Sequence, residues 1–314
     1  MINNNSVELI AFYNVENLFL PDPPSKHKSD PTVSGLRNWN EYKYRHKISN
    51  IAKVFQLITE SEGATPLIIG LAEISGQKPL EDLINNKPFE NYKIVQYDSH
   101  AKRGIGVALL YDAEKIQLIS SETLSYNFPD DINENDDSDH REILHCRFTY
   151  SGEIINVFVV HLPSRREKNI NGEKRAYIVE KFREKLHEIV KRGEATLICG
   201  DFNANPDEDI IKKLLYDDQD NKIFTNPFAE LFAGKIFSTY HRGDGLLFDQ
   251  LILSERFYGT DFPLKYRTAK VFDHESLKQR DGKFSARPAR TFAGSRYIGG
   301  YSDHFPVLIH FSRL

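Results

Sequence analysis

The sequence contains little cysteine, no long apolar run and no excess of basic charge. Its two cysteines, Cys146 and Cys199, both lie in apolar stretches, which predicts buried thiols and not a disulfide or a metal pair. No run of about eighteen apolar residues is present, so we expect no transmembrane helix and no stable membrane insertion. The net charge of -4 excludes a global basic field, and any site for a polyanion must therefore be local.

The composition is otherwise ordinary. The chain has 314 residues, of which 40% are hydrophobic and 27% charged, as is typical of a globular enzyme with a sizeable core. No segment rich in Gly, Ser or Pro separates two cores, so we expect one domain over residues 1–314. Residues 1–6 lack the basic and apolar segments of a secretion signal. We therefore expect a soluble protein, cytoplasmic as the sequence stands, or secreted or periplasmic if a leader was removed. The sequence indicates no particular protein partner.

Many short strand-like runs occur with few helical patterns between them. Residues 42–58 and 173–192 carry apolar side chains at helical spacing, and Gly193 ends the second pattern. So many strands with so few helices do not fit a doubly wound parallel sheet. They indicate an α+β sandwich of two stacked, mostly antiparallel sheets with helices on the outer faces. The expected strands are residues 7–13, 66–72, 92–96, 104–111, 116–124, 143–149, 154–161, 196–199, 236–240, 246–253, 269–272 and 305–311.

The segment LICGDFNANP, residues 197–206, brings polar side chains to the end of an apolar strand. Asp201 follows the apolar run, Asn203 comes two residues later, and Asn205-Pro206 forces a turn. Such strand ends present polar groups to a ligand beyond the sheet edge. An Asp that can take a proton, beside an Asn that can donate a hydrogen bond to an oxyanion, fits hydrolysis of a phosphate ester.

Acidic and amide side chains follow two other apolar runs. Asn14 and Glu16 come after the first strand, and Glu73 comes after the strand at residues 66–72. Mg2+ accepts one or two carboxylates together with phosphate oxygens and waters, so Glu73 is the best candidate ligand for such an ion. Taken alone, a solvated strand end is the simpler interpretation of these acids.

His161 ends the strand at residues 154–161 and precedes a short basic segment that includes Arg165 and Arg166. An imidazole at a strand end can bind a phosphate or move a proton. Arginine pairs with phosphate through two parallel hydrogen bonds. The segment therefore predicts a phosphate contact, with a solvated basic loop as the alternative.

Asp249 lies inside the apolar run at residues 246–253, where a buried carboxylate needs a partner. His304, in the segment YSDHFP, is the candidate partner, because an Asp behind a His fixes its tautomer and favours the imidazolium. A cap on backbone amides is the alternative role for Asp249. Asp303 adds a second carboxylate that can serve a metal ion or a water molecule.

Together these clusters resemble the endonuclease/exonuclease/phosphatase superfamily, which has the deoxyribonuclease-I-like fold. Their order along the chain matches, and the resemblance covers nearly the whole chain. The segments that carry it are Asn14-Val15-Glu16, Glu73, His161, Gly200-Asp201-Phe202-Asn203, Asp249 and Ser302-Asp303-His304. The resemblance implies a four-layer α/β/β/α sandwich with its site at one edge of the two sheets. It also implies a metal-dependent phosphodiesterase or phosphomonoesterase that uses Mg2+, with Mn2+ or Ca2+ as alternatives.

The resemblance further implies how a metal ion would be bound. Glu73 is similar to the principal metal ligand of the family, and Asn14 is similar to the residue beside the metal and the phosphate. Glu16 takes the place of a second acidic residue near the metal. Asp303 resembles a possible second metal ligand.

Catalytic roles are implied in the same way. Asp201 resembles the residue that orients or deprotonates the attacking water, and Asn203 resembles a donor to the phosphoryl oxygen. His304 is similar to the histidine that contacts the scissile phosphate, and Asp249 to the acid that orients it. His161 resembles the second histidine of the nuclease branch.

The chain departs from the family pattern at one point. In the secreted nucleases the second histidine is backed by its own glutamate, whereas residues 101–104 read AKRG here and supply no acid. This departure puts the role of His161 as an acid in doubt. Arg103 is available to contact phosphate instead.

Nucleic acid, either DNA or RNA, is the first expectation for the substrate. Arginines in several loops, with aromatic side chains between them, would line a rim that tracks a phosphate backbone and stacks on bases. These arginines are Arg103, Arg165, Arg166, Arg242, Arg287, Arg290 and Arg296. A lipid head group or a small phosphoester is the alternative, because the net charge opposes tight non-specific binding of nucleic acid. A non-catalytic binding module on the same fold is a third reading, and the complete set of acids and His304 argues against it.

Overall fold

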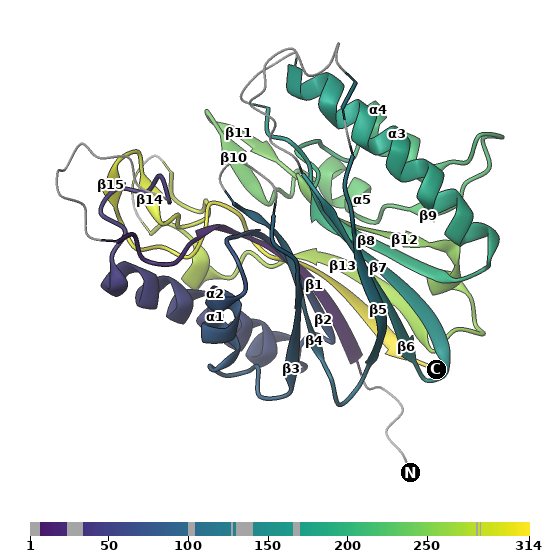
Figure 1. Cartoon of the computed structure of the whole chain (residues 1–314), viewed down its shortest axis with the longest axis horizontal. Helices are drawn as coiled ribbons and strands as arrows, with labels where there is room; N and C mark the ends of the chain where they lie inside the picture. Colours follow the sequence, from purple (N-terminus) through teal and green to yellow (C-terminus); the bar gives the residue numbers. More distant parts are fainter. Residues whose placement is uncertain are drawn as a thin grey trace.

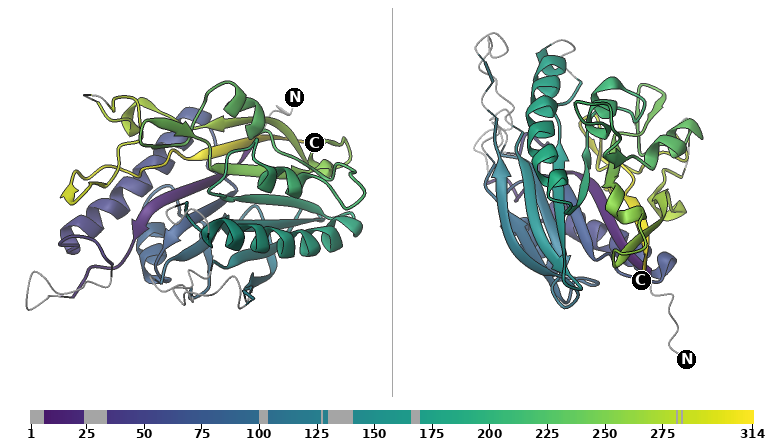
Figure 2. Two further views of the ribbon diagram at one scale, coloured as in Figure 1. Left: turned by 90° about the horizontal axis from the view of Figure 1, so that it is seen from above. Right: turned by 90° about the vertical axis from the view of Figure 1, so that its right-hand side faces the viewer.

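Two six-stranded sheets stack face to face, and helices cover both outer faces (Figure 1). The expected α+β sandwich of four layers, α/β/β/α, is confirmed, and Figure 2 shows helices α1 and α3 on opposite sides of the sheets. This computed structural model describes residues 7–23, 34–99, 104–126, 128–129, 141–165, 170–280, 282 and 284–314.

The first sheet has the strand order β13-β16-β1-β2-β4-β3. Its neighbouring strands are antiparallel except for β1 and β2, which are parallel. The strands are β1 (Val7–Leu18), β2 (Ile68–Ile74), β3 (Tyr92–Gln96), β4 (Gly106–Asp112), β13 (Leu264–Val271) and β16 (Val307–Arg313).

The second sheet has the strand order β5-β6-β7-β8-β12-β9 and again contains one parallel pair, β7 and β8. Its strands are β5 (Gln117–Leu124), β6 (Ile143–Tyr150), β7 (Glu153–His161), β8 (Ala195–Asp201), β9 (Phe224–Thr225) and β12 (Asp249–Ser254). Because parallel strands end at the same edge of a sheet, β7 and β8 bring His161 and Asp201 side by side.

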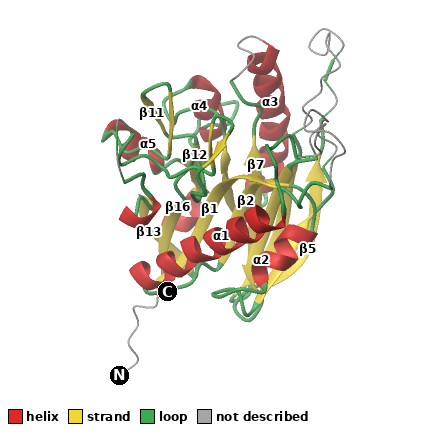
Figure 3. Ribbon diagram, turned by 90° about the vertical axis from the view of Figure 1, so that its left-hand side faces the viewer, coloured by secondary structure: helices red, strands yellow, loops and turns green. Residues whose placement is uncertain are grey.

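Two long helices form the outer layers. Helix α1 (Glu41–Glu62) lies across β16, β1 and β2 (Figure 3), and α3 (Ile170–Lys191) covers the second sheet. Asn40 caps α1 by accepting a hydrogen bond from the backbone of Lys43, and Gly63 ends it at a φ of 74°. The shorter helices are α2 (Lys78–Ile84), α4 (Asp209–Leu215), α5 (Phe228–Ala233) and the 3-10 turns η1 (Glu255–Tyr258) and η2 (Glu275–Leu277).

Several element boundaries differ from those expected. Strand β1 continues to Leu18 through an irregularity in its pairing with β2, and the run at residues 246–253 is split between two strands. The small elements β9 and α5 carry too little periodicity to be recognised. Residues outside the two main sheets form the hairpins β10 (Thr239–His241) with β11 (Asp244–Leu246), and β14 (Phe292–Ala293) with β15 (Arg296–Tyr297).

One large apolar core fills the space between the sheets and under α1, and a second core lies between α3 and the second sheet. Cys146 and Cys199 are both buried and unpaired, which confirms that prediction. In the described part of the chain, none of the helices has the length and apolar character needed to cross a membrane.

Candidate active site

Strand ends from both sheets meet at one edge of the sandwich. Asn14 of β1 donates from Nδ2 to Asp201 Oδ2 of β8 at 3.0 Å and to Glu73 Oε1 of β2 at 3.3 Å. The backbone N–H of Glu16 donates to Asn14 Oδ1 at 3.1 Å. A backbone N–H can only donate, so this contact fixes the orientation of the amide. Asn14 therefore bridges a carboxylate of each sheet as a donor.

The backbone at this edge adopts left-handed conformations that are uncommon for residues other than glycine. Glu16, Asn17, Glu73 and Asn203 have φ values of 53°, 57°, 66° and 48°. The pairing of β1 with β2 is irregular at the same place, and Asn17 N donates to Glu73 Oε2 at 2.9 Å. Such conformations cost free energy and cluster at functional sites. At this irregular pairing the Glu73 side chain contacts Asn14 and Asn17 of β1, and Asn14 also reaches Asp201 of β8.

A histidine–aspartate pair lies beside Asp201. His304 Nδ1 is 2.7 Å from Asp249 Oδ2, and Ser238 Oγ donates to the same oxygen at 2.5 Å. Asp249 is fully buried. Burial alone would lower the pKa of His304, but the carboxylates of Asp249 and Asp303 outweigh it and raise that pKa well above its ordinary value. These surroundings favour the imidazolium form of His304, whose Nε2 lies 3.9 Å from Asp201 Oδ2.

Asp201 stands between two imidazoles. Its Oδ2 lies 3.8 Å from His161 Nε2 and 3.9 Å from His304 Nε2, distances that are too long for direct hydrogen bonds. Burial, and after it the charge of Asp249, raises the pKa of Asp201 to about 6. A carboxylate with this pKa can take a proton near neutral pH.

His161 is buried and has an unexpected neighbour. Its Nδ1 lies 3.0 Å from Nη1 of Arg141, which precedes β6. Burial, followed by the positive charge of Arg141, lowers the pKa of His161 well below its ordinary value. The group behind this histidine is thus a cation, where the family pattern has a glutamate.

The loop after β8 is held by backbone contacts. Asn203 N donates to Asp201 Oδ1 at 2.9 Å, and Asn203 Nδ2 donates to Leu162 O at 2.9 Å, which leaves one amide hydrogen for a ligand. Arg165 Nε donates to Asn203 O at 2.8 Å, its guanidinium lies 4.8 Å from the Phe248 ring centroid, and its Nη2 pairs with Glu208. In this position Arg165 braces the loop.

Glu16 and Asp303 belong to a charged cluster next to Asn14. Glu16 Oε2 accepts from Thr291 N at 2.6 Å and lies 4.0 Å from Lys47 Nζ. Burial, and then the charge of Asp303, raises the pKa of Glu16 to about 7. Arg290 Nη2 donates to Asp303 Oδ2 at 2.7 Å, and Asp303 Oδ1 is 3.9 Å from His304 Nε2. Both acids already have cationic or N–H partners.

Arg103 and Arg166 lie outside the described residues. Arg287 is another of the arginines that were predicted to line a phosphate-binding rim. Its guanidinium carbon lies 4.9 Å from the ring centroids of both Tyr240 and Phe284, so it packs against aromatic side chains.

The sequence pattern missed three side chains that support the site, because none of them belongs to a local motif. These are Lys47, Arg141 and Ser238. Arg290 was expected at a phosphate-binding rim, and it pairs with Asp303.

The ligand atoms fit a hard divalent cation, since carboxylate oxygens predominate, whereas Asn14 turns its N–H groups toward the two carboxylates. Glu73 is only partly buried, and among the described residues its carboxylate oxygens accept hydrogen bonds from N–H groups of Asn14 and Asn17 alone. Asp201, Asp249 and His304 also offer ligand atoms within 4.8 Å of one another, and this group could hold a metal ion. The imidazolium of His304 would repel a cation there, so Glu73 is the better position.

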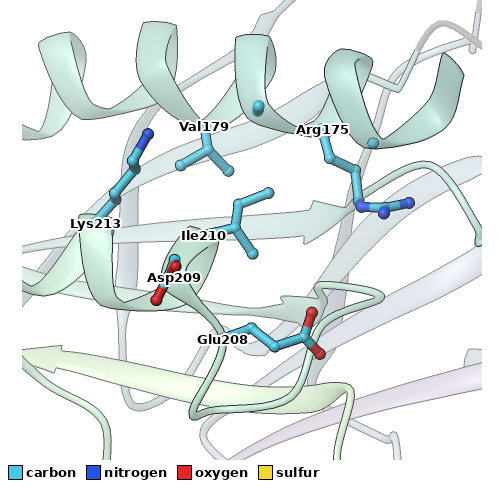
Figure 4. Close-up of a pocket in the computed structure, with 8 residues that line it drawn as sticks. Arg175, Val179, Glu208, Asp209, Ile210 and Lys213 are labelled. Atoms are coloured by element: carbon cyan, nitrogen blue, oxygen red, sulfur yellow. The ribbon is translucent and has the colours of Figure 1, made fainter. Parts of the chain in front are cut away.

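A cavity of about 530 Å³ lies between α3 and α4 (Figure 4). Val179 and Ile210 face each other across it, and Arg175, Glu208 and Lys213 line its margins. None of the catalytic candidates lines this cavity.

Residues 9–313 match a family model described as the endonuclease/exonuclease/phosphatase family. No match is found among the curated proteins. Solved structures do resemble the chain. TDP2 of D. rerio, complexed with a single-strand DNA product, is 13% identical over 98% of this chain and 99% of that chain, with a TM-score of 0.60.

Two further structures have a similar fold. The catalytic domain of human nocturnin, with bound sulfate, is 15% identical over 98% of this chain and 95% of that chain, with a TM-score of 0.57. A mannosyl-6-phosphatase of Bacteroides thetaiotaomicron is 14% identical over 97% of this chain and 99% of that chain, with a TM-score of 0.61. At such identities the likeness establishes the fold alone.

Proposed function

Because the chain belongs to the endonuclease/exonuclease/phosphatase family, a family of phosphate-ester hydrolases, we propose that it is a Mg2+-dependent phosphodiesterase that cleaves DNA or RNA. The convergence of Glu73, Asn14, Asp201, Asp249 and His304 at one sheet edge carries this proposal. Acid–base groups beside an oxygen-rich metal position are what hydrolysis of a phosphodiester requires.

In the proposed reaction, water attacks the phosphorus in line with the leaving oxygen and gives its proton to Asp201. Nε2 of the His304 imidazolium donates to a phosphoryl oxygen, while Asp249 holds the other ring nitrogen. The free amide hydrogen of Asn203 supplies a second donor. Glu73 would hold the divalent ion, which when bound neutralises charge on the phosphate and the leaving oxygen.

A panel of phosphoesters tests the proposal. Plasmid DNA, oligonucleotides of DNA and RNA, phosphoinositides and a chromogenic phosphodiester should each be incubated with Mg2+ and with a chelator. We expect cleavage of at least one nucleic acid with Mg2+ and none with chelator. Indifference to every phosphoester, with the metal present and the protein folded, would contradict the function.

Two substitutions test the assigned chemistry. Asp201→Asn and His304→Ala should each lower the rate by about 10²–10⁴, the usual contribution of one acid–base group, while folding is retained. Asp209→Asn is a matched control, because that side chain is 94% exposed on α4. Wild-type turnover in both Asp201→Asn and His304→Ala would contradict the catalytic roles assigned to these two residues.

A small phosphoester or a lipid head group is the second candidate. It is favoured by the net charge of -4 and by the engagement of rim arginines with acids, as in Arg165–Glu208 and Arg290–Asp303. Nucleic-acid binding falls steeply with rising salt, because phosphate contacts release counterions. Cleavage that is insensitive to salt and to competing polyanions would favour the small substrate.

A further inference from the structure

The contact between Arg141 and His161 fixes the state of the histidine ring. A guanidinium has only N–H groups and can only donate, so the His161 Nδ1 that faces Arg141 Nη1 at 3.0 Å accepts a hydrogen bond. The single ring hydrogen of the neutral imidazole is then on Nε2. That nitrogen faces Asp201 Oδ2 at 3.8 Å, at the edge where a phosphate would lie.

The strand pairing makes this contact a consequence of the fold. Strands β6 and β7 are antiparallel neighbours in the second sheet, with Leu144 opposite Val159. Continuing this register places the residues just before β6 beside the end of β7, where His161 lies. His161 is only 4% exposed, so its ring has little freedom to turn away from Arg141.

A histidine that protonates a leaving group must first carry a hydrogen on both nitrogens. Protonation of Nδ1 would bring two donors and two positive charges together in a buried place. His304 has the opposite surroundings, because a carboxylate faces its Nδ1. The surroundings therefore favour a neutral imidazole at His161 and a protonated imidazole at His304.

We propose that Arg141 is a positioning residue that holds His161 neutral with its hydrogen on Nε2, so that His161 donates a hydrogen bond to a phosphoryl oxygen and does not protonate the leaving group. This inference rests on the proposed function. No proton leaves His161 during the reaction, and an alkoxide leaving group takes its proton from a water molecule. A nitrophenolate leaving group needs none.

Leaving-group dependence separates the two roles of His161. The variant His161→Gln, which keeps a neutral N–H donor, is assayed on thymidine 5′-p-nitrophenyl phosphate and on a thymidine dinucleotide. Because Gln keeps a donor, we expect a small loss of kcat that is the same on both substrates, at most about tenfold, the scale of one lost hydrogen bond. A loss of about 10²–10⁴ on the dinucleotide alone, with the nitrophenyl ester spared, would overturn the proposal.

The tautomer of His161 can also be determined by NMR, without an activity assay. In metal-free protein with 15N-labelled histidine, the NMR shifts of His161 should show an unprotonated Nδ1 and a protonated Nε2. Arg141→Lys, which keeps a cationic donor, should preserve this pattern. Arg141→Glu should move a hydrogen to Nδ1, because a carboxylate then accepts from it.

Arg147→Met is the matched control for Arg141. Arg147 lies on β6, the strand that Arg141 precedes, but it pairs with Glu194, so the His161 tautomer should not change. An unchanged His161 spectrum in Arg141→Glu would overturn the role of Arg141. If the protein hydrolyses no phosphoester, the proposed function fails, whereas the NMR result still decides whether Arg141 sets the ring.

Discussion

Lys47 shows how a single buried charge can organise this site. Its side chain is 1% exposed, and Nζ donates to Thr291 Oγ1 and to Tyr301 O, both at 2.6 Å, near the carboxylate of Glu16. These contacts tie helix α1 to β1 and to the segment that leads into His304. A buried lysine is costly unless it is paired, so its partners must remain in place.

We predict that Lys47→Met destabilises the protein by about 3–5 kcal/mol, because the substitution leaves Glu16 without its cation and two acceptors without a donor. Unfolding in urea measures the change. Lys43→Met is the control on the same face of α1, where the exposed ammonium donates to Arg37 O at 2.9 Å and lies 5.5 Å and 5.0 Å from the Phe292 and Tyr297 ring centroids. Its loss should cost about 0.5–1 kcal/mol. Equal effects of the two substitutions would contradict this account.

The sequence pattern predicts those site residues that interrupt or end an apolar run. Asp201, Glu73 and Asp249 are recognisable because a carboxylate in such a place needs a partner. Lys47 left a weaker signal, because it lies four residues before Ile51 and so on the apolar face of α1. Arg141 left none, since its role depends on the pairing of β6 with β7.

At the scale of elements, Gly200 allows the parallel strands β7 and β8 to approach closely beside the site. A Cβ at this position would lie 2.2 Å from Val160 O, a backbone atom that cannot move without disturbing the strand. The strand that ends in Asp201 therefore depends on a residue without a side chain.

We predict that Gly200→Ala destabilises the protein by about 1–3 kcal/mol and lowers activity, because the strands must separate next to Asp201. Thermal unfolding and the rate on the best substrate measure the two effects. Gly172→Ala is the control, since its Cβ would meet only Arg175 Nη2 at 4.0 Å and alanine favours a helix. A variant at Gly200 as stable as the wild type would contradict the close-packing argument.

Elements with many periodic residues were predictable, and those shaped by tertiary contacts were not. Helices α1 and α3 follow from their apolar spacing. The continuation of β1 to Leu18 could not be seen, because Glu16 and Asn17 take left-handed conformations that only the neighbouring strand supports. The two-residue β9 is defined by its pairing with β12 and has no pattern of its own.

At the scale of the whole molecule, folding brings together acids from distant segments, and their mutual repulsion is a cost of the metal-free state. The pKa of Glu16 is raised to about 7 and that of Asp201 to about 6, in each case mainly by burial. Between the unfolded and folded pKa values the folded protein binds more protons, so its stability falls as pH rises from about 4 to about 7. His304, with a raised pKa, acts in the same direction, and His161, with a lowered pKa, opposes it below its ordinary value.

A divalent cation should compete with these protons for the same edge of the sandwich. We therefore predict that Mg2+ raises the melting temperature more at about pH 8 than at about pH 5, because metal ligands must be deprotonated. At a hundredfold excess over its dissociation constant, the ion should add about 2.7 kcal/mol of stability. Calorimetric melts with Mg2+ and with K+ of matched ionic strength measure the difference.

The variants Glu73→Gln and Glu16→Gln distinguish the binding of Mg2+ from the binding of protons. Glu73→Gln removes the proposed ligand and should abolish the Mg2+ shift while keeping the pH dependence of the metal-free protein. Glu16→Gln removes a carboxylate whose pKa is raised, so it should weaken that pH dependence and keep most of the Mg2+ shift. Equal Mg2+ shifts at both pH values, or a full shift in Glu73→Gln, would mean that the ion binds elsewhere. Metal binding and proton release would then be separate events, and Glu73 would lose its assignment as the ligand.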